Sequence, residues 1–472
     1  ICSNKTKLMK RFLHILSSIA ILSASGITTL SAETVPVKLS NVVCFVKFAD
    51  QADNEWEHDF DYYENMFNAV GPEVNSVRNY FSDMSYGNFD WESQLILTEY
   101  VDSHPRSYFC EKSASNPDGY TSLDYLLDTR TRTLVKDMCE YLSTVIPDDV
   151  VLDADNDGTV DNIVMIINGN SERGASNMLW PANNTAPSAR LKGLNVRNYL
   201  KVFDGANGYK SLVAQKLNTG VLCHEMMHTL DAYDLYTSSS SPAKEPVGKW
   251  DLMSDNQTTP QGLTAYMRMA YGRQYGNWLP VEDIPVISEV GEYELLPISS
   301  AEGTVAYKIN PDPTRKEYFM LEYRDRNQIW DYSLPSAGII VYRVNPEVNG
   351  NLGKDCELYI FRPGGAPDKA GNLNKAALGP NTGRISFGTE DDDDYPYYSD
   401  GTRAPFSISD VTLSDNGISF LYHPLTPEDA AVDEINASSG SPRSIFTLQG
   451  IPLDRIPGPG IYIVDGKKVF VK

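Results

Sequence analysis

The feature that most constrains this chain of 472 residues is a pair of histidines four positions apart, in the pentapeptide HEMMH at 224–228. The surrounding segment, residues 210–230, has the pattern of a helix, and positions i and i+4 of a helix share one face. His224 and His228 could therefore bind one Zn²⁺, with Glu225 beside the coordination position that stays open for water. The chain has six histidines in all, so two of them in one pentapeptide are unusual. The alternative is an ordinary helix that happens to carry two histidines.

A catalytic zinc ion usually has three protein ligands, so the chain must supply one more. Asp234 lies six residues after His228 and can bind only if the helix ends at once and the chain turns back. Asp231 stands where that turn is expected, and aspartate tolerates the left-handed backbone conformation, though less readily than glycine. We therefore predict Asp234 as the third ligand. The alternatives are Glu245 in the following loop as the ligand, or acidic residues that only cap the helix.

A second group of oxygen-bearing side chains occupies alternate positions of the segment DADNDGTVD at 153–161. Oxygen ligands at alternate positions, with a glycine at the turn, are typical of EF-hand-like Ca²⁺ loops. Val164 stands at the twelfth position, so a neighbouring residue would have to replace the usual bidentate glutamate. The pattern predicts a structural Ca²⁺, and the alternative is a solvated acidic turn. The predicted ligands are Asp153, Asp155, Asp157, Thr159 and Asp161.

The pattern of predicted elements changes near residue 285. Before it, buried strands and amphipathic helices alternate, which favours an α/β or α+β domain, and we predict α+β over residues 33–285. After it, short apolar runs separated by turn residues predict an all-β, sandwich-like domain over residues 286–424. The predicted strands are 41–48 and 160–168, the predicted helices are 122–145 and 210–230, and a helix that breaks at Gly87 passes into a strand over 76–93.

The first 32 residues predict a signal peptide that is removed on export. Four basic residues precede a mainly apolar run, and small residues stand before Glu33. The run is short and broken by serines, with no stop-transfer charges after it, so a transmembrane anchor is the less favoured alternative. We expect a secreted or cell-surface protein with no membrane span in its mature chain.

The charge balance excludes one class of partner. The chain has 40 Lys and Arg against 63 Asp and Glu, a formal net charge of −23. Binding to a nucleic-acid backbone needs a basic surface, so nucleic acid is not expected as a partner. A surplus of carboxylates suits an extracellular protein or one that holds hard cations such as Ca²⁺.

Several segments, taken together with HEMMH, resemble the M6 family of metzincin-type zinc peptidases, which are the immune inhibitor A-like peptidases. GKWDLMSD at 248–255 is similar to a Met-turn, and the resemblance implies that Met253 forms a hydrophobic floor beneath the zinc ligands. The similarity covers roughly residues 40–420 and implies a metzincin-like zinc peptidase domain over 33–285. The other similar segments are SVRNYFSDMSYGNFDW, VLDADNDGTVDNIVMIINGN, MLWPANN, AYMRMAYGRQYGNWLP and EYFMLEYRDRNQIWDYSLPSAGIIVYRV.

The resemblance implies a secreted zinc endopeptidase that hydrolyses peptide bonds in protein or peptide substrates. A zinc-activated water would attack the scissile carbonyl, with Glu225 as general base and then general acid. Two positions depart from the family pattern: Asp231 stands where the family usually has glycine, and Asp255 where some metzincins have a tyrosine. The alternatives are a catalytically weak peptidase fold that acts as a calcium-stabilised surface-binding module, and a Ca²⁺-dependent carbohydrate-binding protein.

The C-terminal region separates into a linker and a tail. Residues 425–441 are polar and rich in small residues, which is typical of a linker. Residues 442–472 predict a short β tail that resembles the sorting domains of Bacteroidetes-type secreted proteins, on the segments FTLQG and GIYIVDGKKVFVK. The resemblance implies a secretion or sorting signal, and the alternative is a small hairpin that caps the preceding domain.

Overall fold

The structure is a computed structural model of the whole chain, which divides into a unit of residues 1–35 and a compact unit of residues 36–472. The predicted signal peptide lies outside the described residues, as does the predicted linker apart from Leu425. The described residues are 35–170, 178–205, 217–238, 245–366, 369–390, 392, 394–425, 445–447, 452–453, 460–464 and 467–471.

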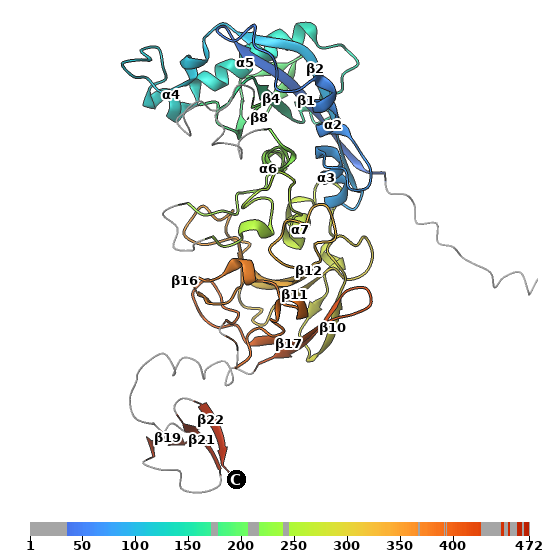
Figure 1. Ribbon diagram of the computed structural model, residues 1–472, viewed down its shortest axis with the longest axis vertical. Coiled ribbons are helices and arrows are strands. Elements are labelled where there is room, and N and C mark those ends of the chain that lie inside the picture. Colours follow the sequence, from blue (N-terminus) through green and yellow to red (C-terminus); the bar gives the residue numbers. More distant parts are fainter. Residues whose placement is uncertain are drawn as a thin grey trace, which may run out of the picture. The chain divides into compact units, whose positions relative to one another are not determined.

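A five-stranded sheet with the order β2-β1-β4-β8-β5 organises the N-terminal half of the compact unit (Figure 1). Its first four strands are parallel, and β5 pairs with β8 in the antiparallel direction at one edge. The central strands read as continuous apolar runs because helices cover both faces of the sheet. The strands are β1 (Val37–Phe48), β2 (Phe89–Asp102), β4 (Ile163–Ile167), β5 (Ala182–Thr185) and β8 (Asn198–Phe203).

Alternate residues of β1 face two different cores. Val43 and Phe45 belong to one buried cluster, and Cys44 and Val46 belong to another, because successive side chains of a strand point to opposite faces. The first cluster includes residues of the helices α2 (Phe60–Asn68), α3 (Val77–Met84) and α6 (Thr219–Thr229). The second includes residues of α5 (Thr129–Val145).

The predicted helix over 122–145 is wrong in one respect, because the structure divides it into α4 (Ser122–Leu127) and α5. Asp128 separates them and has the left-handed conformation, with φ of 50°. Its carboxylate accepts hydrogen bonds from Thr131 and, at 3.2 Å, from the hydroxyl of Tyr199 on β8. A tertiary contact with a distant strand therefore fixes the break, and helical periodicity does not reveal it. The predicted passage from helix to strand at Gly87 is confirmed, since α3 ends at Met84 and β2 begins at Phe89.

The region after residue 285 consists mainly of strands, as predicted. One sheet has the order β14-β13-β12-β11-β9 and a second has the order β10-β18-β17. Phe319 of the first sheet and Phe420 of the second belong to one buried cluster. The strands are β9 (Val286–Ile287), β10 (Gly291–Leu295), β11 (Ala306–Ile309), β12 (Tyr318–Arg324), β13 (Gly338–Val344), β14 (Leu358–Ile360), β17 (Phe406–Leu413) and β18 (Ile418–Pro424).

The other face of the β12 sheet joins the core of the N-terminal half. Met320 and Ile340 belong to the same buried cluster as Leu222 of α6 and Met253. Helix α7 (Ala265–Tyr271) contributes to this cluster as well. The core is therefore continuous across residue 285, where the sequence analysis places a domain boundary.

The remaining strands are short. Four of them form an antiparallel sheet in the C-terminal tail, with the order β20-β19-β21-β22, so the β character predicted for residues 442–472 holds for its described strands. None of the helices in the described ranges is long and apolar enough to cross a bilayer. The short strands are β3 (Thr159–Val160), β6 (Arg190–Leu191), β7 (Leu194–Val196), β15 (Gly365–Ala366), β16 (Lys369–Ala370), β19 (Ile445–Thr447), β20 (Pro452–Leu453), β21 (Gly460–Val464) and β22 (Lys467–Val471).

Gly220, in the first turn of α6, has no room for a side chain. A Cβ atom there would lie 1.7 Å from the carbonyl oxygen of Gln257. Gly220→Ala should therefore lower the free energy of unfolding by about 1–3 kcal/mol, because the helix must shift away from this backbone. Chemical denaturation measures the change. Gly353→Ala is the control, because its Cβ would meet its nearest atom at 3.9 Å; equal stabilities of the two variants would contradict this account of α6 packing.

Candidate metal centre

Helix α6 carries the two histidines on one side of an otherwise buried helix. Asn218 begins it, and its side chain accepts a hydrogen bond from the backbone N–H of Val221 at 3.0 Å. This capping places the start of the helix at Thr219, and residues 206–216, where the sequence analysis begins it, lie outside the described ranges. The rings of His224 and His228 lie edge to face, at an interplanar angle of 88°, with centroids 5.0 Å apart.

The helix ends in a tight reversal at Asp231. The φ angle of Asp231 is 66°, which confirms the left-handed conformation that the sequence predicts. Its N–H donates to the carbonyl of His228 at 3.0 Å, and the N–H of Ala232 donates to the carbonyl of Met227 at 3.1 Å. These two bonds form a Schellman motif, in which the left-handed residue is usually glycine. The chain then runs back toward the histidines.

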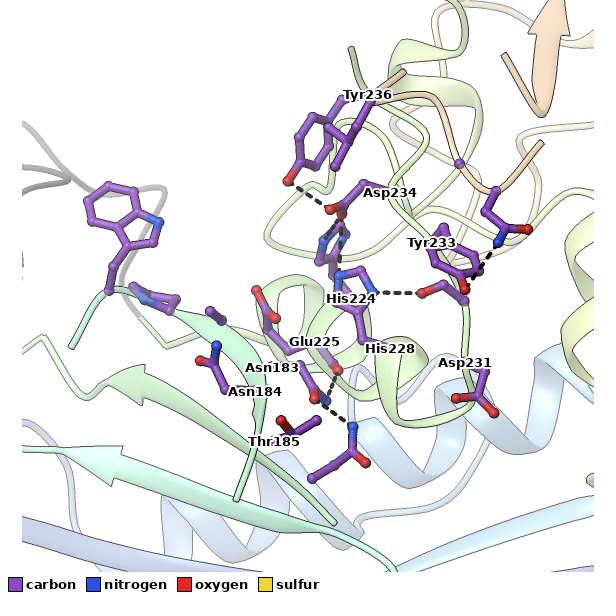
Figure 2. Close-up of a pocket in the computed structure, with 18 residues that line it drawn as sticks. Asn183, Asn184, Thr185, His224, Glu225, His228, Asp231, Tyr233, Asp234 and Tyr236 are labelled. Atoms are coloured by element: carbon purple, nitrogen blue, oxygen red, sulfur yellow. Dashed lines mark hydrogen bonds and ion pairs between the residues drawn. The ribbon is translucent and has the colours of Figure 1, made fainter. Parts of the chain in front are cut away.

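Asp234 meets both imidazoles after this reversal. Its Oδ1 atom lies 3.1 Å from Nε2 of His224 and 3.3 Å from Nε2 of His228 (Figure 2). Two ligand atoms on a tetrahedral zinc ion, each about 2.0–2.1 Å from it, are themselves about 3.3 Å apart. Oδ1 is buried and forms no well-aligned hydrogen bond with a described residue. These three atoms could therefore hold one metal ion.

The atoms behind the three candidate ligands fix their orientation. Nδ1 of His224 lies 3.1 Å from the carbonyl oxygen of Leu252, and Nδ1 of His228 lies 2.7 Å from that of Ala232. A carbonyl oxygen can only accept, so each Nδ1 carries the proton and each Nε2 presents its lone pair to the shared point. The hydroxyl of Tyr236 donates to Oδ2 of Asp234 at 3.0 Å. Oδ1 therefore remains available to a metal ion bound between the two Nε2 atoms.

The charges around the position between Asp234 and the two imidazoles favour a cation. Burial opposes ionisation of Asp234, but the two imidazoles outweigh it and hold the pKa of its carboxyl well below the usual value. Burial also lowers the pKa of His228, but the Asp234 carboxylate outweighs it and raises this pKa to about 9. A buried carboxylate between two imidazoles thus attracts a proton or a metal ion, and the two compete for the same nitrogen atoms.

The turn that contains Met253 supports both ligand segments. Met253 is fully buried, and its carbonyl oxygen accepts a hydrogen bond at 2.7 Å from the N–H of Leu235, the residue after Asp234. The preceding residue, Leu252, supplies the carbonyl that orients His224. The backbone of this turn therefore binds the first candidate ligand directly and the third through its neighbour Leu235.

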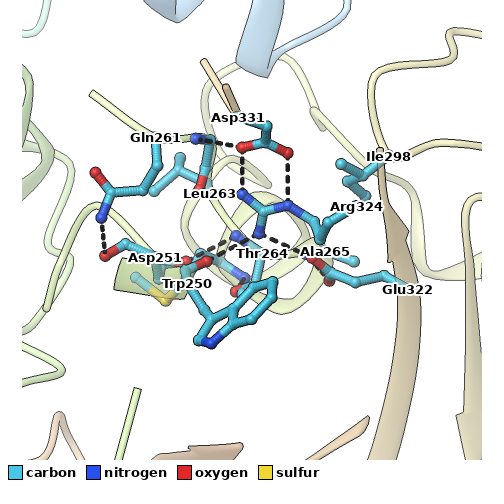
Figure 3. Close-up of polar contacts among 12 residues, drawn as sticks. Trp250, Asp251, Gln261, Leu263, Thr264, Ala265, Ile298, Glu322, Arg324 and Asp331 are labelled. Atoms are coloured by element: carbon cyan, nitrogen blue, oxygen red, sulfur yellow. Dashed lines mark hydrogen bonds and ion pairs between the residues drawn. The ribbon is translucent and has the colours of Figure 1, made fainter. Parts of the chain in front are cut away.

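Arg324 of β12 holds this turn from the β-rich half of the chain. Its guanidinium donates to the carbonyl of Trp250 at 2.9 Å and to that of Gly262 at 3.0 Å (Figure 3). Two further donors bind the carboxylate of Asp331 at 2.5 and 2.7 Å, and Glu322 lies 3.2 Å away. All five N–H donors of a fully buried arginine are thus directed at defined acceptors, which offsets much of its desolvation.

An open cleft of about 520 Å³ lies beside the candidate ligands. Trp180, strand β5, Tyr233, Tyr236 and residues 349, 350 and 352 line it. Asn184 and Thr185 of β5 lie across the opening from Asp234 and Tyr236 (Figure 2). The side chain of Glu225 also faces the cleft. Asn183 of β5 donates to the carbonyl of Glu225 and to the hydroxyl of Thr229, both at 2.8 Å, so it ties this strand to α6.

The structure separates the five predicted calcium ligands. Asp153, Asp155 and Asp161 bring carboxylate oxygens within 4.8 Å of one another. Asp157 is not part of this group, and its Oδ1 accepts a hydrogen bond at 2.7 Å from the N–H of Thr159. Burial raises the pKa of Asp161 to about 6. No observation tests the assignment of Ca²⁺ to this loop, and it stays a prediction.

One residue considered as a ligand lies outside the centre, and one residue that was not predicted belongs to it. Glu245, the alternative third ligand, is exposed and is not part of the group formed by the imidazoles and Asp234; its carboxylate accepts a hydrogen bond from the hydroxyl of Ser254 at 3.4 Å. Tyr236 is not among the site residues predicted from the sequence. Residues i and i+2 of an extended segment share one side, so the spacing from Asp234 to Tyr236 is the signal that could have found it.

No protein-family model matches the chain, and no curated protein matches it either. The resemblance to the M6 family therefore rests on the sequence segments named above.

Asp231 allows a test of the helix exit. Asp231→Gly relieves the left-handed conformation but loses an exposed ion pair with Arg197 at 2.6 Å. We expect the free energy of unfolding to rise by between zero and about 1 kcal/mol. Glycine adopts the left-handed conformation without strain, and this gain outweighs the loss of a surface ion pair. Asp231→Ala loses the ion pair and keeps the strain, so it should be less stable than the glycine variant. Thermal unfolding of both proteins measures the order, and the reverse order would contradict the assignment of strain to this residue.

Proposed function

We propose that the protein is a secreted zinc-dependent endopeptidase that acts on protein or peptide substrates. One observation carries the proposal: two Nε2 atoms and Oδ1 of Asp234 converge at 3.1 and 3.3 Å beside the Glu225 side chain in an open cleft. We further infer a metzincin-like fold over residues 33–285, supported by the Schellman reversal at Asp231 and the buried turn at Met253. The export signal and the sorting role of residues 442–472 rest on the sequence alone.

The residues of the centre divide the chemistry between them. When bound, Zn²⁺ would lower the pKa of a water molecule and polarise the scissile carbonyl. Glu225 lies next to the first ligand on α6, and its carboxylate has no hydrogen bond to another described residue. It is therefore free to take a proton from the attacking water and pass it to the departing amine. Tyr236 keeps its own proton, because burial and Asp234 raise the pKa of its hydroxyl.

Strand β5 supports a peptide as the substrate. It is the last strand in the order β2-β1-β4-β8-β5, and it borders the cleft. An edge strand has free N–H and C=O groups, to which an extended peptide can add as a further strand. Asn183 fixes this edge strand to α6, so a peptide bound along it would have a defined position relative to Glu225.

The first test is the zinc content of the purified protein. We expect about one Zn²⁺ per chain, and loss of most of it in His228→Ala or Asp234→Ala, because two ligands alone bind the ion weakly. Elemental analysis after dialysis measures this. Glu245→Ala is the matched control and should keep its zinc. Unchanged zinc in both ligand variants would contradict the site.

The second test separates catalysis from metal binding. In Glu225→Gln the new side chain has nearly the same shape but cannot accept the proton. The variant should keep its zinc, and its activity should fall at least about 100-fold. Casein digestion, with and without a chelator, measures the activity. Activity within tenfold of the parent would remove Glu225 from the mechanism. A parent protein that holds zinc but digests nothing would favour the alternative, a catalytically weak fold that acts as a binding module.

A further inference from the structure

A buried lysine lies directly behind the edge strand of the cleft. Lys201, on β8, is 3% exposed, and its Nζ atom donates to Oδ1 of Asn184 at 2.6 Å. Among the described residues no carboxylate lies within 4.0 Å of this ammonium, and burial lowers its pKa to about 8. A buried cation without an ion-pair partner is costly, and a methionine would fill the same space without that cost. Such groups often mark functional positions.

The lysine determines which way the Asn184 amide faces. An ammonium group can only donate hydrogen bonds, so the oxygen of the amide must point at Lys201 and its nitrogen must point away. Asn184 lines the cleft, and its Nδ2 atom has no acceptor among the described residues. Figure 2 shows this nitrogen directed toward the open part of the cleft, on the side where Glu225 lies. The cleft therefore presents a fixed donor on β5.

We propose that Asn184 donates a hydrogen bond from Nδ2 to a main-chain carbonyl oxygen of the bound peptide, and that Lys201 is a positioning residue that locks this orientation. The inference rests on the proposed function, because it needs a peptide in the cleft. Strand β5 has only four residues, so backbone pairing alone offers a peptide few hydrogen bonds. A side-chain donor adds one that is independent of the peptide's side chains, since every residue has a carbonyl oxygen.

Without the lysine the amide could rotate and present its oxygen to the carbonyl of the peptide. Two acceptors would then face each other, and the hydrogen bond would be lost. The charge of Lys201 also acts on Glu225. In a Glu225→Gln protein, which lacks that carboxylate, removal of Lys201 should therefore change peptide affinity through Asn184. This dependence distinguishes a positioning role from a general effect on folding or charge.

The test measures peptide affinity in the zinc-loaded Glu225→Gln protein, which binds without cleaving. The ligand is a fluorescein-labelled casein peptide that the parent enzyme cleaves, and fluorescence anisotropy gives Kd. Asn184→Ala should raise Kd about fivefold to tenfold, as expected for loss of one hydrogen bond. Asn184→Asp should raise it at least as much, because the carboxylate pairs with Lys201 and cannot donate.

Lys201→Met tests the positioning role in a double-mutant cycle. It should raise Kd about as much as Asn184→Ala alone and have no further effect when Asn184 is already alanine. Lys192→Met removes the same charge from a lysine that pairs with Asp148, and it should leave Kd within twofold. If Lys201→Met does not fold, the two Asn184 variants decide.

The outcomes separate the inference from the proposed function. If the parent holds zinc and cleaves casein, but Asn184→Ala and Asn184→Asp bind the peptide within twofold of the Glu225→Gln protein, the inference is overturned. Additive effects of Lys201→Met and Asn184→Ala would overturn the positioning role. If the parent neither holds zinc nor cleaves casein, the proposed function fails first, and the inference falls with it.

Discussion

The left-handed turn at Asp231 is the constraint on which the candidate centre depends. Asp234 can reach Nε2 of both histidines only because the chain reverses within three residues of the helix end. Two backbone hydrogen bonds close that reversal, and the N–H of Leu235 then binds the carbonyl of Met253. A helix that continued for another turn would carry Asp234 away from the imidazoles and leave the cleft without a third ligand.

Residues of the β-rich half hold the turn that orients His224. Arg324 fixes the carbonyl of Trp250, two residues before the Leu252 carbonyl that orients His224. Met320 and Ile340 belong to the same buried cluster as Met253. The orientation of a ligand on α6 therefore depends on residues about a hundred positions later in the chain, because a buried turn keeps its shape only when its polar groups are satisfied.

Local signals in the sequence predicted the helix of the histidines, the left-handed residue and the acidic residue that follows it. These depend on spacing within one short segment, so a sequence can carry them. The break at Asp128, by contrast, is set by Tyr199, and the turn at Met253 is held by Arg324. Such pairings join residues about seventy positions apart, and periodicity within a window cannot show them. The contact between Lys201 and Asn184 joins residues only 17 positions apart, but it too depends on the pairing of two strands, which local periodicity does not show.

The most direct test of the account is anomalous X-ray diffraction at the zinc edge from crystals of the zinc-loaded protein. We expect one strong peak within about 2.0–2.2 Å of Nε2 of His224, Nε2 of His228 and an Oδ atom of Asp234. A peak that lacks Asp234 as a ligand would contradict the role of the reversal at Asp231. The absence of any peak between the two imidazoles would contradict the central claim.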